Sequence, residues 1–224
     1  PTALTTYEGR TSGNAYGRVF VAGVTEASGA GAGIEGQLGY GAGSDPTDAS
    51  WAWSALASFN VDDGSGGDEY QQSLTGPAPG AYAMAWRFRI DGGPWTYCDL
   101  DGSGNGVQAA QLPPLTANAF AVTALSLTGT TDRTALVNTQ TAAYTARVVV
   151  PTLTDGTGQG TPLTVELAYG ATGTQPSTWS GWIAATYSAD DADADVYTGT
   201  LTAPASAGAY DVAYRAKLGS NAYV

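Results

Sequence analysis

Apolar and polar residues alternate with a period of two along several short stretches of this chain. In the stretch 81–90, AYAMAWRFRI, large apolar residues alternate with alanine and arginine, and the stretch 210–217, YDVAYRAK, alternates in the same way. A period of two places one face of a strand in the core and the other in water. No stretch shows a sustained period of 3.6 residues, so we expect β-strands and little helix.

Glycine, proline, aspartate and asparagine interrupt the apolar runs, which is typical of an all-β protein with many turns. In the first half, the pattern predicts strands at 18–24, 34–40, 53–59, 69–74, 81–90 and 95–100. Roughly seven short strands in about 100 residues are typical of an Ig-like sandwich. The chain has only one cysteine, so the Cys–Trp–Cys signature of true immunoglobulin domains is absent.

The sequence also repeats itself at an offset of about 128 residues. The stretches that begin at Gly17, Trp53 and Leu74 align with those that begin at Ala146, Trp182 and Leu201. Self-similarity at one offset indicates tandem copies of one fold. We therefore predict an all-β protein of two tandem Ig-like antiparallel β-sandwich domains, 1–110 and 111–224. The boundary is placed at QLPPL, because proline gives no ladder donor. The strand predicted from residue 119 then opens the second domain, with the stretch from residue 2 as its counterpart.

Charge and residue usage exclude several functions. Lysine and arginine total 8 and the net charge is −12, so the chain offers no basic face for nucleic acid or an anionic membrane. No apolar run is long enough for membrane insertion. Histidine is absent and Cys98 is the only cysteine. This removes Ser–His and Cys–His couples, the commonest zinc ligand and any internal disulfide, so we expect no enzyme. The start at Pro1, without methionine or signal, indicates a processed or excised piece.

Several motifs resemble an accessory module that recurs in secreted bacterial proteins. They are a G-Y-G turn at 39–41, a paired tryptophan at 51 and 53, D-E-Y at 68–70, G-x-Y at 80–82 and W-x-Y-x-D-L-D-G at 95–102. The resemblance covers most of the first repeat and weakly the second, where D-V-Y replaces D-E-Y and the closing motif is absent. It implies an extracellular or cell-surface module and no particular activity.

Five tryptophans are candidates for stacking on sugar rings. Two interpretations stand, since a tryptophan that begins a strand also fills a sandwich core. The tryptophans in predicted loops, Trp51 and Trp179, are the better ligand candidates. The full set is Trp51, Trp53, Trp95, Trp179 and Trp182.

Acidic clusters are the weaker candidates, for calcium. The stretch from Asp99 resembles the start of a calcium loop, but Ala110 stands where the bidentate glutamate belongs. The alternative is a set of acidic turn residues open to solvent. Paired carboxylates in these clusters also admit glycoside hydrolysis, the least favoured interpretation. The candidate ligands are Asp99, Asp101, Ser103, Asn105, Asp190, Asp191, Asp193 and Asp195, and a similar cluster comprises Asp62, Asp63, Asp68 and Glu69.

These observations favour a non-catalytic extracellular structural or adhesive module without a cofactor, calcium apart. A carbohydrate-binding module of a secreted hydrolase is the alternative. The expected partners are copies of the chain or a larger secreted parent protein, and glycan in the alternative. The second repeat ends before its counterpart of Tyr97 to Leu100, a closing strand whose absence leaves a sheet edge open. We hypothesise that the N-terminal arm of another copy, with Leu4 and Tyr7, fills this gap and builds a filament.

Overall fold

The structure, a computed structural model, describes residues 2–102 and 106–224. Strands dominate it, and the described helices are two single 3₁₀ turns, η1 (Ala109–Gln111) and η2 (Pro176–Thr178). The all-β prediction is therefore confirmed. The chain divides into two compact units, Pro1–Phe120 and Ala121–Val224, called here the first and second unit.

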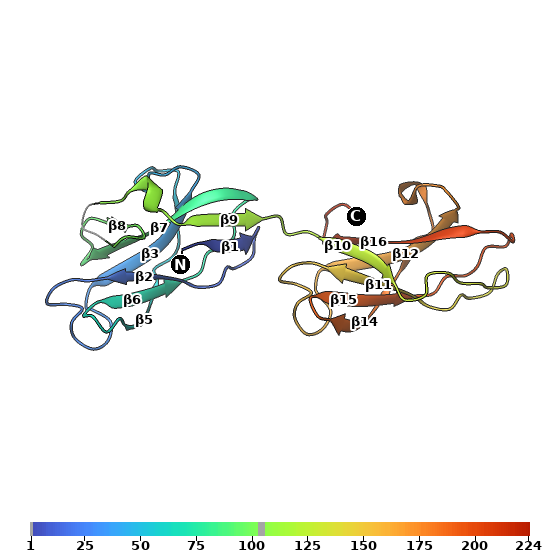
Figure 1. The fold of residues 1–224 in the computed structure, drawn as a ribbon, viewed down its shortest axis with the longest axis horizontal. Helices are drawn as coiled ribbons and strands as arrows, with labels where there is room; N and C mark the ends of the chain where they lie inside the picture. The colour runs from blue at the N-terminus through green and yellow to red at the C-terminus, as the bar shows by residue number, and fades with distance from the viewer. Residues whose placement is uncertain (1, 103–105) are drawn as a thin grey trace. The chain divides into compact units, whose positions relative to one another are not determined.

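The first unit consists of two sheets (Figure 1). One sheet has the order β1-β9-β7-β3-β4, with β8 on the same edge of β7 as β9, and the other has the order β2-β6-β5. The buried core cluster joins residues of both sheets, among them Leu38, Tyr70 and Leu115. The strands are β1 (Leu4–Tyr7), β2 (Ala15–Val19), β3 (Ile34–Gly41), β4 (Ala52–Trp53), β5 (Ser58–Asp62), β6 (Asp68–Gln72), β7 (Gly80–Ile90), β8 (Thr96–Cys98) and β9 (Pro114–Asn118).

The second unit also consists of two sheets, with the orders β10-β11-β15-β14 and β13-β12-β16. The first order corresponds to strands A-B-E-D of an Ig-like sandwich, and the second to the other sheet without its last strand. In this sheet β16 is an edge strand. The strands are β10 (Ala124–Thr128), β11 (Tyr144–Val149), β12 (Leu163–Ala171), β13 (Ile183–Ala184), β14 (Thr186–Asp191), β15 (Ala194–Gly199) and β16 (Tyr210–Leu218).

The predicted boundary at residues 110 and 111 is wrong. Residues 111–120 belong to the first unit, where β9 pairs with β7 on one side and with β1 on the other. The two prolines do not prevent this, because the Pro113 carbonyl still accepts a hydrogen bond from the Met84 amide at 2.8 Å. The closing strand of the first unit is therefore mainly β9, further along the chain than the predicted strand at 95–100.

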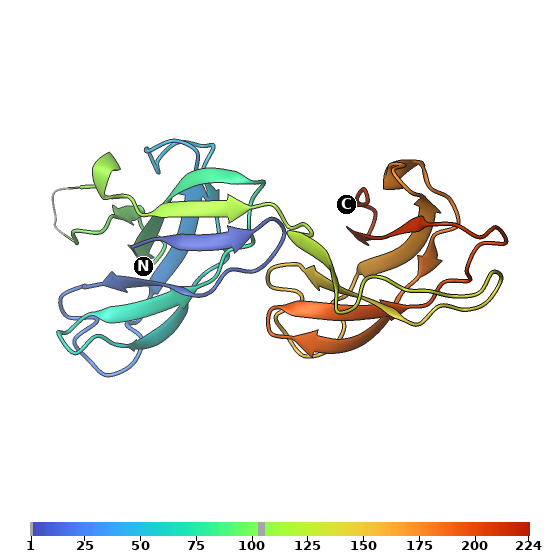
Figure 2. The ribbon, with the colours of Figure 1, turned by 45° about the vertical axis from the view of Figure 1, so that its right-hand side comes forward.

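The N-terminal strand also departs from the prediction. Strand β1 pairs in parallel with β9, Leu4 opposite Leu115, so the sandwich is not wholly antiparallel. Figure 2 shows β1 in blue and β9 in green side by side. Its expected counterpart in the second unit, β10, instead pairs antiparallel with β11. The two segments align in sequence but lie in different sheets of their units.

Candidate functional site

The acidic residues of the first unit hold its loops together. Asp68 is fully buried and accepts a hydrogen bond from the Gly31 amide at 2.7 Å, and Asp62 accepts one from the Gly29 amide at 3.0 Å. The Thr25 hydroxyl of the same loop donates to the Gly66 carbonyl at 2.7 Å. These bonds fasten the loop between β2 and β3 onto the turn between β5 and β6.

The second unit repeats this fastening. Asp195 is fully buried and accepts from the Gly160 amide at 2.8 Å, and Asp190 accepts from the Gly158 amide at 3.1 Å. The Thr154 hydroxyl donates to the Asp193 carbonyl at 2.7 Å. Both units use the same contacts, so Asp62 and Asp68 in the first unit and Asp190 and Asp195 in the second hold the neighbouring loops in place.

The pKa values of two neighbouring carboxyl groups, Asp190 and Asp195, shift in opposite directions because their surroundings differ. Burial raises the pKa of Asp195 above its usual value, although the Gly160 amide bond acts against the shift. The Tyr187 hydroxyl, and then the Gly158 amide, lower the pKa of the exposed Asp190. The same contact with Asp190 raises the pKa of Tyr187 to about 12. The raised carboxyl is buried and accepts the Gly160 amide hydrogen, so it supports the loop from within the unit.

Calcium binding stays a prediction. Within 2–102 and 106–224, no group of three or more Asp, Glu, Cys or His side chains is placed to hold a metal. Asp191 and Asp193 both contact Arg147, and Asp99 accepts a bond from the Gln108 amide at 2.8 Å. Asp101 lies in the turn after β8, whereas Ser103 and Asn105 fall outside the described residues.

Trp51 and Trp53 pack onto glycines of strand β3, and because Gly39 to Gly41 continue this strand, the prediction of a turn at G-Y-G is wrong. A Cβ on Gly39 would lie 2.4 Å from the Trp53 ring, and one on Gly41 would lie 2.4 Å from Trp51. Gly170 makes the same room for Trp179 in the second unit. Trp51 is only 5% exposed, so its prediction as an exposed sugar platform is wrong. An indole that covers a backbone of glycine cannot present both faces to a ligand.

Arginines lie over the rings of Trp53 and Trp95 in the first unit. The Arg87 guanidinium lies 4.1 Å from the Trp53 ring centre and 4.3 Å from that of Trp95, and Arg89 lies 4.4 Å from Trp95. Arg89 also pairs with Glu35, with 2.7 Å between Nε and Oε2. The arginines on the predicted wet face of β7 thus form a ladder with aromatic rings, each contact stabilising by about 0.5–2 kcal/mol.

The second unit repeats the ladder with partly different residues. Arg215 lies 4.3 Å from the Trp182 ring centre and 3.9 Å from that of Tyr223, and Lys217 lies 4.6 Å from Tyr223. Trp182 stacks on the half-buried Trp179 with 6.2 Å between ring centres. Glycan binding by Trp53, Trp95, Trp179 and Trp182 therefore stays a prediction, for rings that are already engaged by their own unit.

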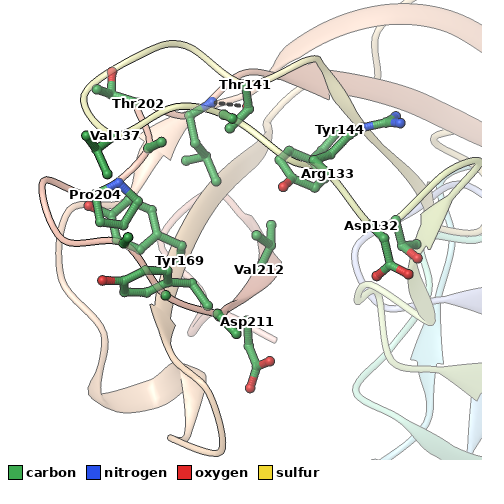
Figure 3. Close-up of a pocket in the computed structure, with 18 of the residues that line it drawn as sticks. Asp132, Arg133, Val137, Thr141, Tyr144, Tyr169, Thr202, Pro204, Asp211 and Val212 are labelled. Carbon is green, nitrogen blue, oxygen red and sulfur yellow. Dashed lines mark hydrogen bonds between the residues drawn. The ribbon is translucent and has the colours of Figure 1, made fainter.

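The units differ where β9 closes the first one. In the first unit, β9 pairs with Gly80–Ala83 of β7 and buries its own Leu115 and Ala117. The equivalent part of β16 begins at Tyr210 and borders a groove of about 690 Å³ (Figure 3). Tyr169, Val212 and Tyr144 line it together with the turn at Pro204.

The equivalence of the two places rests on matching contacts. Tyr82 meets Tyr40 edge to face at 5.5 Å, and Tyr210 meets Tyr169 in the same way at 5.6 Å. The Tyr82 hydroxyl donates to the carbonyl four residues before it, as does that of Tyr210. At the far end of β16, Val224 exchanges two backbone bonds with Ala216, as the pairing of Thr96 with Phe88 predicts by offset. The groove thus lies at the position in the second unit that β9 occupies in the first.

The sequence predicted an open edge at the counterpart of Tyr97 to Leu100, and did not predict the groove or the ladders. The ladders leave a signal, because Arg87 and Arg89 recur as Arg215 and Lys217 at the repeat offset. The groove leaves a weaker one, since its wall includes the loop 131–141, which has no sequence match in the first repeat.

The last reactive side chain named from the sequence is the thiol of Cys98. Burial, and then Asp99, raise the pKa of the Cys98 thiol to about 11, so it is a poor nucleophile at neutral pH. In the part of the chain that the structure describes, no helix has the length and apolar character to cross a membrane.

Comparisons with known proteins concern the fold alone. No protein-family model matches the sequence, and no curated protein matches it. The fibronectin(III)-like modules of CbhA from Clostridium thermocellum are similar in structure, with 15% identity, 96% of this chain and 82% of that chain covered, and a TM-score of 0.26. A chimeric titin Z1Z2–Z1Z2 tandem that carries a GRGDS peptide from fibronectin is similar with 12% identity, 96% and 93% covered, and a TM-score of 0.25. Both scores are low, so the architecture rests on the strand order and register given above.

Proposed function

We propose that this chain is a non-catalytic structural or adhesive module that works outside the cell and joins copies of itself head to tail by strand addition. The observation that carries the proposal is the open edge of β16 beside the groove of the second unit. An uncovered edge strand is a template for pairing with another chain. The extracellular location and a larger secreted parent protein are supported by the sequence resemblance.

Internal contacts support the non-catalytic part of the proposal. The buried carboxylates Asp68 and Asp195 fasten loops, and Arg87 and Arg215 stack on aromatic rings. General acid–base catalysis needs a titratable group that is free to exchange a proton with a substrate. The carboxylates and arginines described above make their contacts with residues of their own unit.

Carbohydrate binding is the second candidate, favoured by the half-buried stacked pair Trp179 and Trp182. Stacking needs an indole face or edge that a sugar ring can reach. Calcium belongs to this proposal only as a weak, non-essential ligand of the loops at 99–101 and 190–195.

Sedimentation velocity of the full chain over a range of concentrations tests the first candidate. We expect the mean mass to rise with concentration, because strand addition between copies need not close. A chain without residues 1–10 should stay monomeric, and its second unit should unfold at a lower temperature than in the assembled protein. Tryptophan fluorescence of the shortened chain checks that the first unit remains folded.

A monomer at every concentration would contradict assembly. A glycan array with the same full chain then decides the second candidate. Binding that is lost in Trp179→Ala would favour carbohydrate, and an array without binding would exclude it.

A further inference from the structure

We infer that the first unit binds a small, neutral, apolar ligand in a cavity between its two sheets. The cavity has a volume of about 920 Å³, and strands of both sheets contribute to its walls. Ligand pockets in proteins typically have volumes of about 300–1,000 Å³ and are mostly apolar, with a few polar groups. The site is independent of any assembly of copies through the second unit.

The inner faces of the strands make the walls apolar. On β7, Trp86 and Phe88 are buried, two residues apart, and line the cavity. Cys98 lies opposite Trp86 in the pairing of β7 with β8, so the two side chains share a face of the sheet. Val19 of β2 lines the cavity from the other sheet. Such walls suit a flat ring system, because aromatic side chains both bury a ring and stack against it.

The charged residues of the lining favour a neutral ligand. Arg18 pairs with Glu69, with 3.1 Å between Nε and Oε2, and Arg89 pairs with Glu35 at 2.7 Å between the same atoms. The Asp99 carboxylate accepts a hydrogen bond from a backbone amide at 2.8 Å. Among the described residues, Arg18, Glu69, Arg89 and Asp99 are the charged ones that line the cavity, and each has a partner within the unit. A charged ligand would therefore lose its hydration without gaining an unpaired counter-charge.

Trp86 supplies the polar contact that we assign to the ligand. Its indole N–H is buried and has no hydrogen-bond partner among the described residues. The equivalent ring of the second unit, Tyr214, differs, because its hydroxyl donates to the Tyr144 carbonyl at 2.9 Å. A buried donor without an acceptor is costly, so a ligand oxygen that reaches the Trp86 N–H from the cavity gains a bond that the unit does not make itself. We therefore expect a ligand with one carbonyl, ether or hydroxyl oxygen.

The second unit shows which groups suit this side of the sandwich. There β10 pairs with β11, and the two leucines of β10 lie opposite Val148 and Ala146. At the repeat offset these two residues correspond to Val19 and Gly17, which line the cavity of the first unit. The segment of the first repeat that matches β10 is β1, and β1 pairs with β9 in the other sheet. Where the second unit places leucines, the first unit therefore offers apolar walls to a ligand.

Binding of the neutral naphthalene ketone prodan by the full chain tests the cavity. Prodan is flat and apolar, carries one carbonyl oxygen, and its fluorescence shifts to the blue when it leaves water. We expect saturable binding to one site. Cys98→Phe, which fills the cavity from β8, should lower the affinity about tenfold or more. The matched control Cys98→Ser keeps the space and should bind prodan within about twofold of the unchanged chain.

Alkylation of Cys98 in the unchanged chain gives a second measurement, which does not depend on how well a variant folds. Cys98 is the only cysteine, so the rate of its reaction with N-ethylmaleimide reports on this site alone. At a prodan concentration of about ten times its Kd, this rate should fall about tenfold. The inference is overturned if prodan shows no saturable binding, if it binds without slowing the alkylation, or if it binds a folded Cys98→Phe chain equally well.

The hydrogen bond to Trp86 is tested separately. The affinity for prodan is compared with that for an analogue in which a methylene group replaces the carbonyl, both in the unchanged chain and in Trp86→Phe. Loss of the N–H should lower the ratio of the two affinities roughly two- to tenfold. An unchanged ratio would show that the ligand oxygen does not meet Trp86, and it would overturn that assignment.

Discussion

Gly17→Ala should destabilise the first unit by about 1–3 kcal/mol, the cost of overpacking a filled core. A Cβ at Gly17 would lie 2.4 Å from the Trp86 ring, which is 7% exposed and has little room to move. Urea unfolding of the full chain measures the change through the transition of the first unit.

The second unit supplies the compensating change. There Ala146 takes the place of Gly17 and Tyr214 takes the place of Trp86, and both are buried. The double variant Gly17→Ala, Trp86→Tyr should therefore recover a large part of the loss, with a coupling of about 1–2 kcal/mol. If the effects of the two single changes simply add, the repeat does not conserve this packing and the residue equivalence is wrong.

Asp195→Ala should destabilise the second unit by about 1–3 kcal/mol, because the buried Gly160 amide loses its acceptor. Asp195→Asn keeps a carbonyl acceptor and removes the buried charge, so at neutral pH it should equal or exceed the wild type in stability. The measurement is the free energy of unfolding of the three proteins from pH 3 to about pH 7, the range over which carboxyl groups titrate.

The pH dependence has a definite sign. Burial raises the folded-state pKa of Asp195 above the usual 3.8, so the cost of its charge is present above the folded pKa. That cost disappears as the pH falls through the folded pKa, and the advantage of Asp195→Asn should shrink with it. The lowered pKa of Asp190 has the opposite effect, but both proteins keep Asp190. An advantage that grows in acid would show that the carboxylate is stabilised by its surroundings.

Alternation and the repeat offset together predicted much of the fold. The strand predicted at 81–90 is β7 and the one at 34–40 is β3, since a period of two shows clearly where one face is buried. The boundary was wrong because Pro113 and Pro114 were taken to interrupt strand pairing, whereas a proline at the start of a strand loses only its donor. The pairing of β1 could not be predicted, because Leu4–Tyr7 fits either sheet and only the presence of β9 decides between them.

The candidate site was harder to predict. Tryptophan spacing does not tell a stacking platform from an indole packed on glycine, and Trp51 proved to be the latter. Clustered aspartates likewise have the same sequence whether they bind a cation or accept amide hydrogens, as Asp68 and Asp195 do. The sequence predicted an edge without its counterpart of Tyr97 to Leu100, whereas the groove lies further along β16, at the position that β9 occupies in the first unit.

Amide hydrogen exchange of the dilute full chain tests most directly whether the edge of β16 is open. The Met84 amide donates a hydrogen bond to the carbonyl of Pro113, directly before β9, so it should be protected from exchange. Its equivalent, Val212, lines the groove, and the Val212 amide should exchange much faster. When the chain is concentrated, protection should appear at Val212 and leave Met84 unchanged. Equal protection of Val212 and Met84 in the dilute protein would contradict the account, because it would mean that the edge of β16 is already covered.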